Sequence, residues 1–161
     1  MGLLPYYLTS ALPGESGEEY DQRSTVGTAY DSLYEPLLAG SRSSDSSGRG
    51  GGKIRITVGN EIVMDGLMSV DGDWSDYGGG SGGSIYIRAY GMDGIGQISA
   101  NGGYGNGTSG GGSAGRISIV TDTMNEFTEE GVFSNAGGGG DTTYQAGGGG
   151  TVYLEVSIVD L

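Results

Sequence analysis

The sequence predicts an all-β protein, a glycine-rich β-solenoid of about three and a half rungs with two strands in each rung. Three observations predict this fold. A Gly-Gly-x-apolar-x-apolar element recurs along the chain, a Gly-x-apolar-Ser element recurs between its copies, and both alternate apolar with polar residues. Such alternation is typical of half-buried strands, and a fixed period above about 20 residues is typical of stacked supersecondary units.

The two elements keep nearly the same spacing. Copies of the first element lie at residues 51–56, 82–87, 114–119 and 149–154, with an alanine replacing one glycine in the third copy. Their first apolar residues follow one another at intervals of 31, 32 and 35 residues: Ile54, Ile85, Ile117 and Val152. The anchors of the second element follow at intervals of 30 and 35 residues: Met68, Ile98 and Phe133. We therefore expect the anchors of the first element to lie side by side in one sheet.

Glycine accounts for 37 of the 161 residues. Ordering a glycine costs more backbone entropy than ordering any other residue, so a folded chain must use its glycines for a geometric purpose. We expect the glycine runs at the corners between strands, where positive φ or close backbone approach is needed. In the alternative architecture, the runs form a bundle of polyproline-II-type helices flanked by short strands.

The first 48 residues differ from the repeat, because they contain all three prolines and no long glycine run. We divide the chain into an N-terminal arm and acidic loop at residues 1–29, a cap and serine-rich linker at residues 30–48, and a glycine-rich β-repeat domain at residues 49–161. The apolar segment 30–38 is expected to cap the first rung, since a solenoid must cover the ends of its core.

Charge and composition exclude several classes of function. Seven basic and twenty acidic residues give a net charge of −13, which disfavours nucleic acid and anionic membranes as partners. The chain has no cysteine and no histidine, and histidine is the commonest general base and transition-metal ligand. No apolar run approaches the roughly 20 residues that span a bilayer. We therefore expect a protein that is not an enzyme, needs no cofactor and does not insert into a membrane.

The chain resembles a known glycine-rich repeat of large extracellular or cell-surface proteins of bacteria, ciliates and plants. Its units read GGGxGGxIxI followed by xISAxGG, and residues 78–87 and 97–103 match them closely. A lead-in segment of the same family is matched by Tyr30, Ser32, Pro36, Gly40 and Ser41. The resemblance covers roughly residues 30–156, although the first unit lacks the second glycine pair. It implies a role in surface structure or adhesion and supplies no catalytic residues.

Two places carry candidate sites. Asp71, Asp73 and Asp76 begin like a calcium-binding EF-hand loop, but Asp76 stands where that loop needs glycine. They are candidate calcium ligands, and the alternative is a solvated acidic loop. Asn106 begins the only N-glycosylation sequon, Asn-Gly-Thr, in a glycine-rich stretch typical of a surface loop.

These patterns predict an extracellular or cell-surface structural protein, a subunit of a filament that assembles head-to-tail from copies of itself. The last predicted strand, residues 152–159, has an unpaired edge, and the apolar arm at residues 2–12 supplies a strand that a neighbouring copy lacks. The predicted assembly residues are Leu3, Leu4, Tyr6, Tyr7, Leu8, Val152, Leu154 and Val156.

The alternative function is an adhesin or carbohydrate-binding module within a larger surface protein, with glycans as partners. Tyrosines at strands and corners are the candidates for a sugar-stacking face, although tyrosines in such places also pack with a wet hydroxyl. The tyrosines are Tyr77, Tyr86, Tyr90, Tyr104, Tyr144 and Tyr153.

Overall fold

The computed structural model describes residues 7–9, 31–43, 47–106, 109–124, 132–140 and 146–157. These residues form strands and extended connections without any helix, so none of them belongs to a helix that could cross a membrane. The strands are β1 (Tyr7–Thr9), β2 (Lys53–Thr57), β3 (Glu61–Val63), β4 (Leu67–Ser69), β5 (Ser84–Asp93), β6 (Gln97–Ser99), β7 (Arg116–Met124), β8 (Val132–Ser134) and β9 (Thr151–Val156). The described part of the chain is therefore strand-rich, as expected of an all-β protein.

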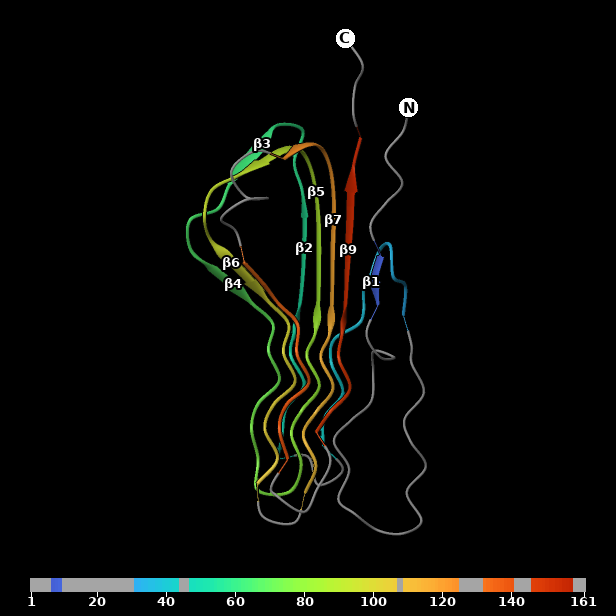
Figure 1. The fold of residues 1–161 in the computed structure, drawn as a ribbon, viewed down its shortest axis with the longest axis vertical. Coiled ribbons are helices and arrows are strands. Elements are labelled where there is room, and N and C mark those ends of the chain that lie inside the picture. Colours follow the sequence, from blue (N-terminus) through green and yellow to red (C-terminus); the bar gives the residue numbers. More distant parts are fainter. Residues whose placement is uncertain are drawn as a thin grey trace.

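Strands β2, β5, β7 and β9 lie side by side in a parallel sheet (Figure 1). Ile54 pairs with Ile85, Ile85 pairs with Ile117, and Ile117 pairs with Val152. The anchors of the first repeat element therefore stand in one row, as their spacing predicts. β1 joins the far side of β9 in antiparallel orientation, and β3 pairs with the second half of β5.

A second parallel sheet is formed by β4, β6 and β8. Met68 pairs with Ile98, and Ile98 pairs with Phe133, so the anchors of the second repeat element also stand in one row. Each repeat unit thus supplies strands to both sheets. Neither sheet closes on itself, and the two lie at an angle to each other (Figure 1).

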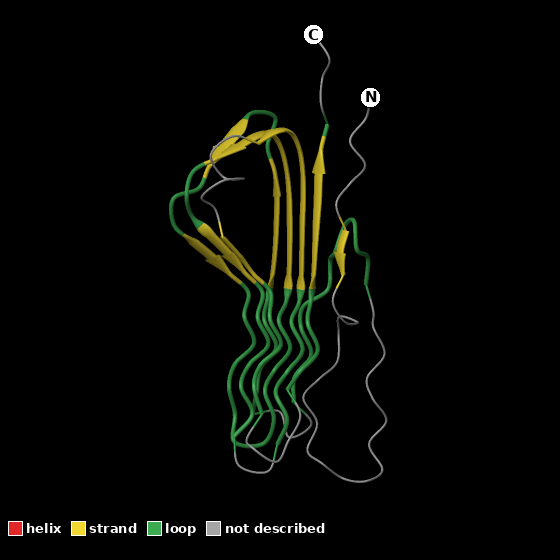
Figure 2. Cartoon of the chain, viewed as in Figure 1, coloured by secondary structure: helices red, strands yellow, loops and turns green. Residues whose placement is uncertain are grey.

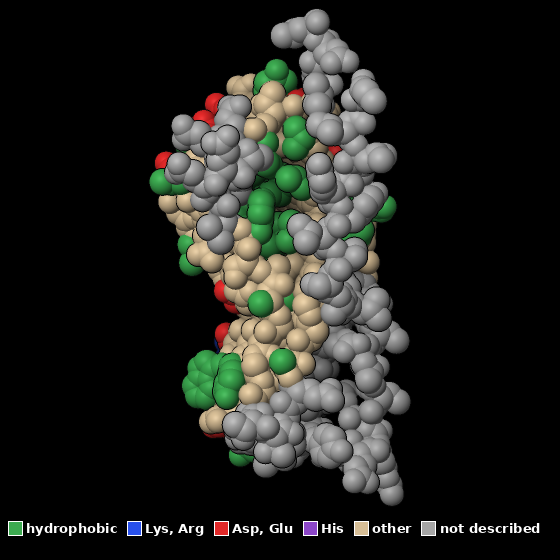
Figure 3. All heavy atoms as spheres, in the orientation of Figure 1, with side chains coloured by type: hydrophobic (Ala, Val, Ile, Leu, Met, Phe, Trp, Pro, Cys, Tyr) green, Lys and Arg blue, Asp and Glu red, His purple; other side chains and the backbone are tan. Residues whose placement is uncertain are grey.

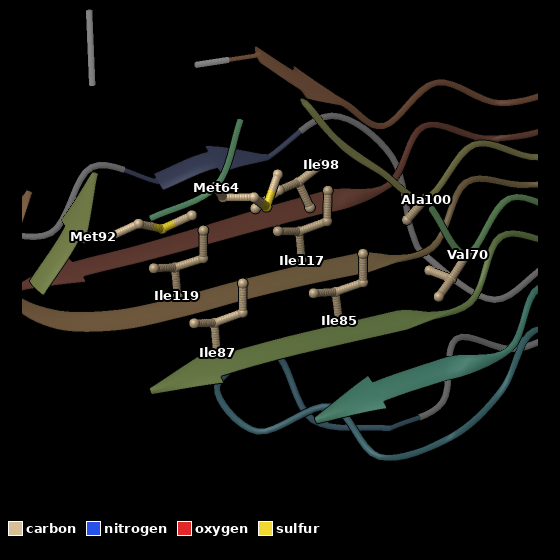
Figure 4. Close-up of a cluster of buried hydrophobic side chains, with 9 residues drawn as sticks. All are labelled: Met64, Val70, Ile85, Ile87, Met92, Ile98, Ala100, Ile117 and Ile119. Atoms are coloured by element: carbon tan, nitrogen blue, oxygen red, sulfur yellow. The ribbon is translucent and has the colours of Figure 1, made fainter. Parts of the chain in front are cut away.

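The hydrophobic core fills the space between the two sheets (Figure 4). Ile85 and Ile87 of β5 and Ile119 of β7 are 0% exposed, and Ile98 of β6 packs in the same cluster. Burying one such side chain contributes about 1.5–3 kcal/mol. The first and last units are covered less well, and their core residues are only half-buried: Ile54, Ile56, Met68, Phe133, Val152 and Leu154.

Below the strands, the glycine-rich segments run side by side as extended chains (Figure 2). We call them the glycine bundle, which comprises residues 40–43, 48–52, 70–73, 78–83, 100–105, 109–115, 135–139 and 146–150. Backbone hydrogen bonds join these segments to one another. The bundle continues directly into the strands, because β5, β7 and β9 each begin at the residue after a bundle segment.

Hydrogen bonding in the glycine bundle repeats every three residues. The backbone N–H of Gly80 donates to the Asp73 carbonyl at 2.9 Å. Three residues later, Gly83 donates to Val70 of the same neighbouring segment at 2.8 Å. The two residues between them donate to two other segments. A period of three is that of a polyproline II helix, which makes no internal hydrogen bonds and so leaves its backbone groups for its neighbours.

The segments of the bundle lie too close together for side chains between them. A Cβ on Gly112 would lie 2.0 Å from the carbonyl oxygen of Gly80, and a Cβ on Gly80 would lie 2.0 Å from that of Arg49. Among the described glycines, only Gly78 and Gly94 have a positive φ. The expectation that the glycine runs form corners is therefore wrong for most of them, because they serve close backbone approach along straight segments.

Replacing Gly112 by alanine is expected to lower the free energy of unfolding by at least about 2 kcal/mol, because a neighbouring backbone must move to admit the methyl group. Gly52→Ala is the matched control, since Gly52 is exposed and no atom lies within 4 Å of its added Cβ. The control should leave stability unchanged or raise it by up to about 1 kcal/mol by restricting the unfolded chain. Urea unfolding followed by circular dichroism measures both, and equal losses would contradict close packing at Gly112.

Candidate functional site

Residues 31–38, which we call the strap, cross the outer face of the first sheet. Ser84 of β5 donates its hydroxyl to the carbonyl of Leu38 at 2.6 Å. Ser118 of β7 donates its hydroxyl to the carbonyl of Tyr34 at 2.6 Å. The strap therefore lies across several strands of the outer face, because its backbone carbonyls accept hydrogen bonds from buried hydroxyls there. The role of this segment as a cap on the first rung stays a prediction.

A buried ion pair holds the start of the strap. Nε of Arg116 lies 3.6 Å from Oδ2 of Asp31, and the two side chains are 2% and 7% exposed. The carboxylate of Asp31 also accepts hydrogen bonds from the backbone N–H groups of Ser32, Leu37 and Leu38 at 2.8, 2.8 and 2.7 Å. Asp31 has a φ of 78°, in the left-handed region that aspartate and asparagine tolerate better than most residues.

Opposing effects act on the pKa of Asp31. Burial raises this pKa, whereas the backbone hydrogen bonds from Leu38, Ser32 and Leu37 and the charge of Arg116 lower it, and the net result is a lowered pKa. A carboxyl group whose pKa is lowered by folding stabilises the protein above its unfolded pKa, and this stabilisation is lost as the pH falls through the folded pKa. We therefore expect the strap to be held more weakly in acid.

An aromatic layer lies between the strap and the sheet. The guanidinium carbon of Arg55 lies 4.6 Å from the ring centroid of Tyr86, and its NH2 nitrogen lies 3.4 Å from the carboxylate of Glu35. The rings of Tyr34 and Tyr153 meet edge to face with centroids 4.9 Å apart. Because Tyr86 and Tyr153 are only 2% and 6% exposed, their rings are fixed by packing.

Beside the strap, the outer face of the first sheet holds an open groove of 510 Å³. Its lining includes Arg88 of β5, Val120 of β7 and Glu155 of β9, which belong to one row of the sheet. Tyr34 of the strap and the exposed Tyr90 of β5 also line it. Volumes of about 300–1,000 Å³ are typical of sites for small ligands.

The tyrosines proposed for one sugar-stacking face divide between two places. Three of them line the groove: Tyr86, Tyr90 and Tyr153. Tyr104 is exposed within the glycine bundle and Tyr77 is exposed just before one of its segments, while Tyr144 lies outside the described residues. The groove therefore gathers part of the predicted face, and it adds Tyr34 from the strap, which periodicity in the repeat does not reveal.

The predicted assembly residues that the structure describes meet at the edge of the first sheet. β1, which contains Tyr7 and Leu8, pairs with β9 so that Leu8 is the register partner of Val152. Val152 and Leu154 pack against the core, whereas Val156 is 40% exposed. The remaining predicted assembly residues of the arm lie outside the described residues: Leu3, Leu4 and Tyr6.

The candidate calcium ligands make separate contacts. Oδ1 of Asp71 accepts a hydrogen bond from the backbone of Asn101 at 2.5 Å, and Oδ1 of Asp76 accepts one from the side-chain amide of Asn106 at 2.9 Å. Asp73 is exposed. Within the described ranges, no three acidic side chains form a group that could hold a metal ion. Calcium binding by these residues and glycosylation of Asn106 stay predictions.

A ladder of polar side chains beside the second sheet was missed from the sequence. Oδ1 of Asp71 accepts a hydrogen bond from the hydroxyl of Ser99 at 2.5 Å. One unit later, Oδ1 of Asn101 accepts hydrogen bonds from the hydroxyl of Ser134 at 3.1 Å and from the backbone of Ala136 at 2.8 Å. The signal was a serine followed two residues later by Asp or Asn in the first two units.

No protein-family model matches this chain, and neither a curated protein nor a solved structure matches it. An inference about function therefore depends on the residues and their geometry. The two features with functional potential are the edge at which β1 meets β9 and the groove beside the strap.

Asp31→Asn is expected to lower the free energy of unfolding at neutral pH by about 1–3 kcal/mol, because it removes the negative charge beside the buried Arg116 and replaces a charged hydrogen-bond acceptor by a neutral one. Asparagine tolerates positive φ, so the substitution adds little backbone strain. The difference between the two proteins should shrink as the pH falls through the lowered pKa of Asp31, since the wild-type carboxylate is then protonated. Chemical unfolding across a pH series measures both effects.

The matched control for that experiment is Glu35→Gln. Glu35 pairs with Arg55, but their side chains are 54% and 47% exposed. Exposed ion pairs contribute less than about 1 kcal/mol, so this control should cost little at any pH. Equal and small losses in the two variants would show that the buried pair does not hold the strap.

Proposed function

We propose that this protein is an extracellular structural protein, a subunit of a surface filament that assembles head-to-tail from copies of the chain. The observation that carries the proposal is the pairing of β1 with the edge of β9. A strand contributed by an arm can make the same hydrogen bonds with β9 of another copy, and exchange of an identical element is a low-cost route to assembly. Such a contact joins unlike surfaces and leaves the series open-ended, which is the geometry of a filament.

The proposal includes a finer architecture, in which each repeat unit is one rung of a β-solenoid. Its support is that each unit pairs in register with the next in both sheets. The three-residue period of hydrogen bonding favours polyproline-II-type geometry for the glycine runs. The two architectures weighed from the sequence would then describe different parts of the same rung.

The incomplete burial of the end units supports growth of the stack. Ile56 and Met68 of the first unit are half-buried, although their partners Ile87 and Ile98 in the next unit are 0% exposed. Ile54 is half-buried, although its partner Ile85 in the next unit is 0% exposed. Figure 3 shows hydrophobic side chains at the level of the strands and a further group of them beside the mainly tan glycine bundle. A repeat unit buries its apolar surface only when it has a neighbour on each side, so another copy would stabilise an open end.

The arm is long enough to reach a neighbouring copy. The 21 residues from 10 to 30 separate β1 from the strap. A chain of that length spans up to about 70 Å when fully extended, whereas neighbouring strands in a sheet are only about 4.8 Å apart. We infer that β1 of one copy pairs with β9 of the next copy in the filament.

The proposed location is extracellular, on the basis of the resemblance of the repeat to that of cell-surface proteins. Asn106 is exposed and would be open to N-glycosylation there. The high net negative charge of −13 favours solubility and disfavours nucleic acid as a partner. We propose no enzymatic activity and no cofactor, and the partner is a second copy of the chain.

The double variant Leu8→Cys with Val152→Cys tests strand exchange, because the chain has no cysteine and these two residues are paired in the register of β1 and β9. After mild oxidation of assembled protein, we expect a ladder of covalent oligomers on a non-reducing gel, and a reductant should collapse it to monomer. Leu8→Cys alone is the matched control and can give dimers at most. If filaments are present but the double variant cross-links only within single chains, the exchange of β1 between copies is wrong.

Deletion of residues 1–13 tests the donor-arm mechanism, in which β1 of one copy pairs with β9 of the next, separately from the filament function. Negative-stain microscopy of the full chain should show filaments, and the deletion should abolish them. Filaments that persist unchanged after the deletion would refute the donor-arm mechanism alone. A full chain that stays monomeric under all assembly conditions would refute the filament function itself.

A further inference from the structure

We propose that the open groove beside the strap binds a neutral oligosaccharide, a function separate from filament assembly. The groove has a volume of 510 Å³ and is built jointly by the strap and the first sheet. Tyr34 comes from the strap, Arg88 and Tyr90 come from β5, and Glu155 comes from β9. Because hydrogen bonds and the buried ion pair of Asp31 hold the strap on the sheet, the groove is formed before any ligand arrives.

The groove contains aromatic rings on which the apolar faces of sugars can pack. Tyr34 and Tyr90 both line it, and each is 53% exposed. The ring of Tyr153, which is 6% exposed, supports Tyr34 at a centroid distance of 4.9 Å and an interplanar angle of 87°. A pyranose ring carries C–H bonds on one face, which pack on an aromatic π face, and a phenol hydroxyl can form hydrogen bonds with the hydroxyl groups of a sugar.

Charged groups in the same groove can form hydrogen bonds with the hydroxyl groups of a sugar. Arg88 is exposed and has no ion-pair partner in the described part of the chain. Glu155 accepts a hydrogen bond from the hydroxyl of Tyr153 at 2.7 Å, which orients its carboxylate. Asp122 is half-buried in the lining. A hydroxyl group both donates and accepts, so a diol can bond to carboxylates and to a guanidinium at the same site.

The placement of charge disfavours an anionic ligand and suits a neutral one. Arg88 stands in a row of the sheet between Thr57 and Val120 and gives the groove one cation beside its carboxylates. Asp122 and Glu155 line the same groove, and the whole chain carries a net charge of −13, so a polyanion would be repelled. A ligand with many hydroxyl groups and no net charge satisfies both sets of groups.

A glycan array that carries neutral, acidic and amino sugars tests the proposal with the folded full chain as the probe. We expect binding to neutral oligosaccharides of three or more units, followed by calorimetry on the best of them. Arg88→Ala and Tyr90→Ala should each weaken that binding at least about tenfold. Tyr77→Ala is the matched control, because Tyr77 is 57% exposed but does not line the groove, and it should leave the affinity unchanged.

Three results would overturn the proposal. One is an array on which no neutral glycan binds, and another is binding confined to acidic or amino sugars. The third is neutral-sugar binding that both groove variants retain at full affinity while Tyr77→Ala loses it. Circular dichroism and the urea midpoint of each variant show whether it is folded, and because Tyr90 and Arg88 are changed separately, loss of fold in one leaves the other as the test.

Discussion

Backbone hydrogen bonds between glycine segments are the constraint on which the rest of this structure depends. These bonds require segments so close that a Cβ on Gly112 would lie 2.0 Å from a carbonyl oxygen of its neighbour. The segments lead directly into the strands, so the alignment of the bundle also sets the register of the sheets above it. Gly83 and Gly115 donate to Val70 and Ala100 of neighbouring segments immediately before β5 and β7 begin. The strands then place side chains of the same kind in rows, and the row of isoleucines forms the core.

The two faces of the first sheet have different roles, since the inner face forms the core and the outer face holds the strap and the groove. Its inner face carries the apolar row of Ile85 and its partners, and this face belongs to the core. Its outer face carries hydroxyls, tyrosines and charged groups, and the strap covers one part of it while the groove lies beside that part. The proposed assembly uses neither face but the edge, where β1 meets β9. Polymerisation and ligand binding, as proposed, therefore use different surfaces and do not compete for the same residues.

The strands and their alignment in one sheet could be predicted, because both the alternation of apolar and polar residues and the long period of the repeat can be counted directly along the sequence. Ile54, Ile85, Ile117 and Val152 could be aligned by counting alone. The use of the glycines could not be predicted in the same way, since glycine suits both a corner and close backbone contact. The apolar composition of the strap predicts that it packs on the repeat, but its position has no sequence signal, because the serine hydroxyls bond to its carbonyl groups, which every residue carries. The groove depends on the strap, so only its tyrosines on β5 and β9 were foreseen.

Detection of scalar couplings across hydrogen bonds in the glycine bundle by long-range HNCO spectroscopy tests this account most directly. We expect cross-peaks from the amide of Gly83 to the carbonyl of Val70 and from the amide of Gly80 to the carbonyl of Asp73. Both amides should also be protected from exchange with solvent. Rapid exchange of these amides with water, in a protein whose strands remain paired, would contradict it. The sheets would then be aligned by their side chains, and the glycine segments would only be linkers.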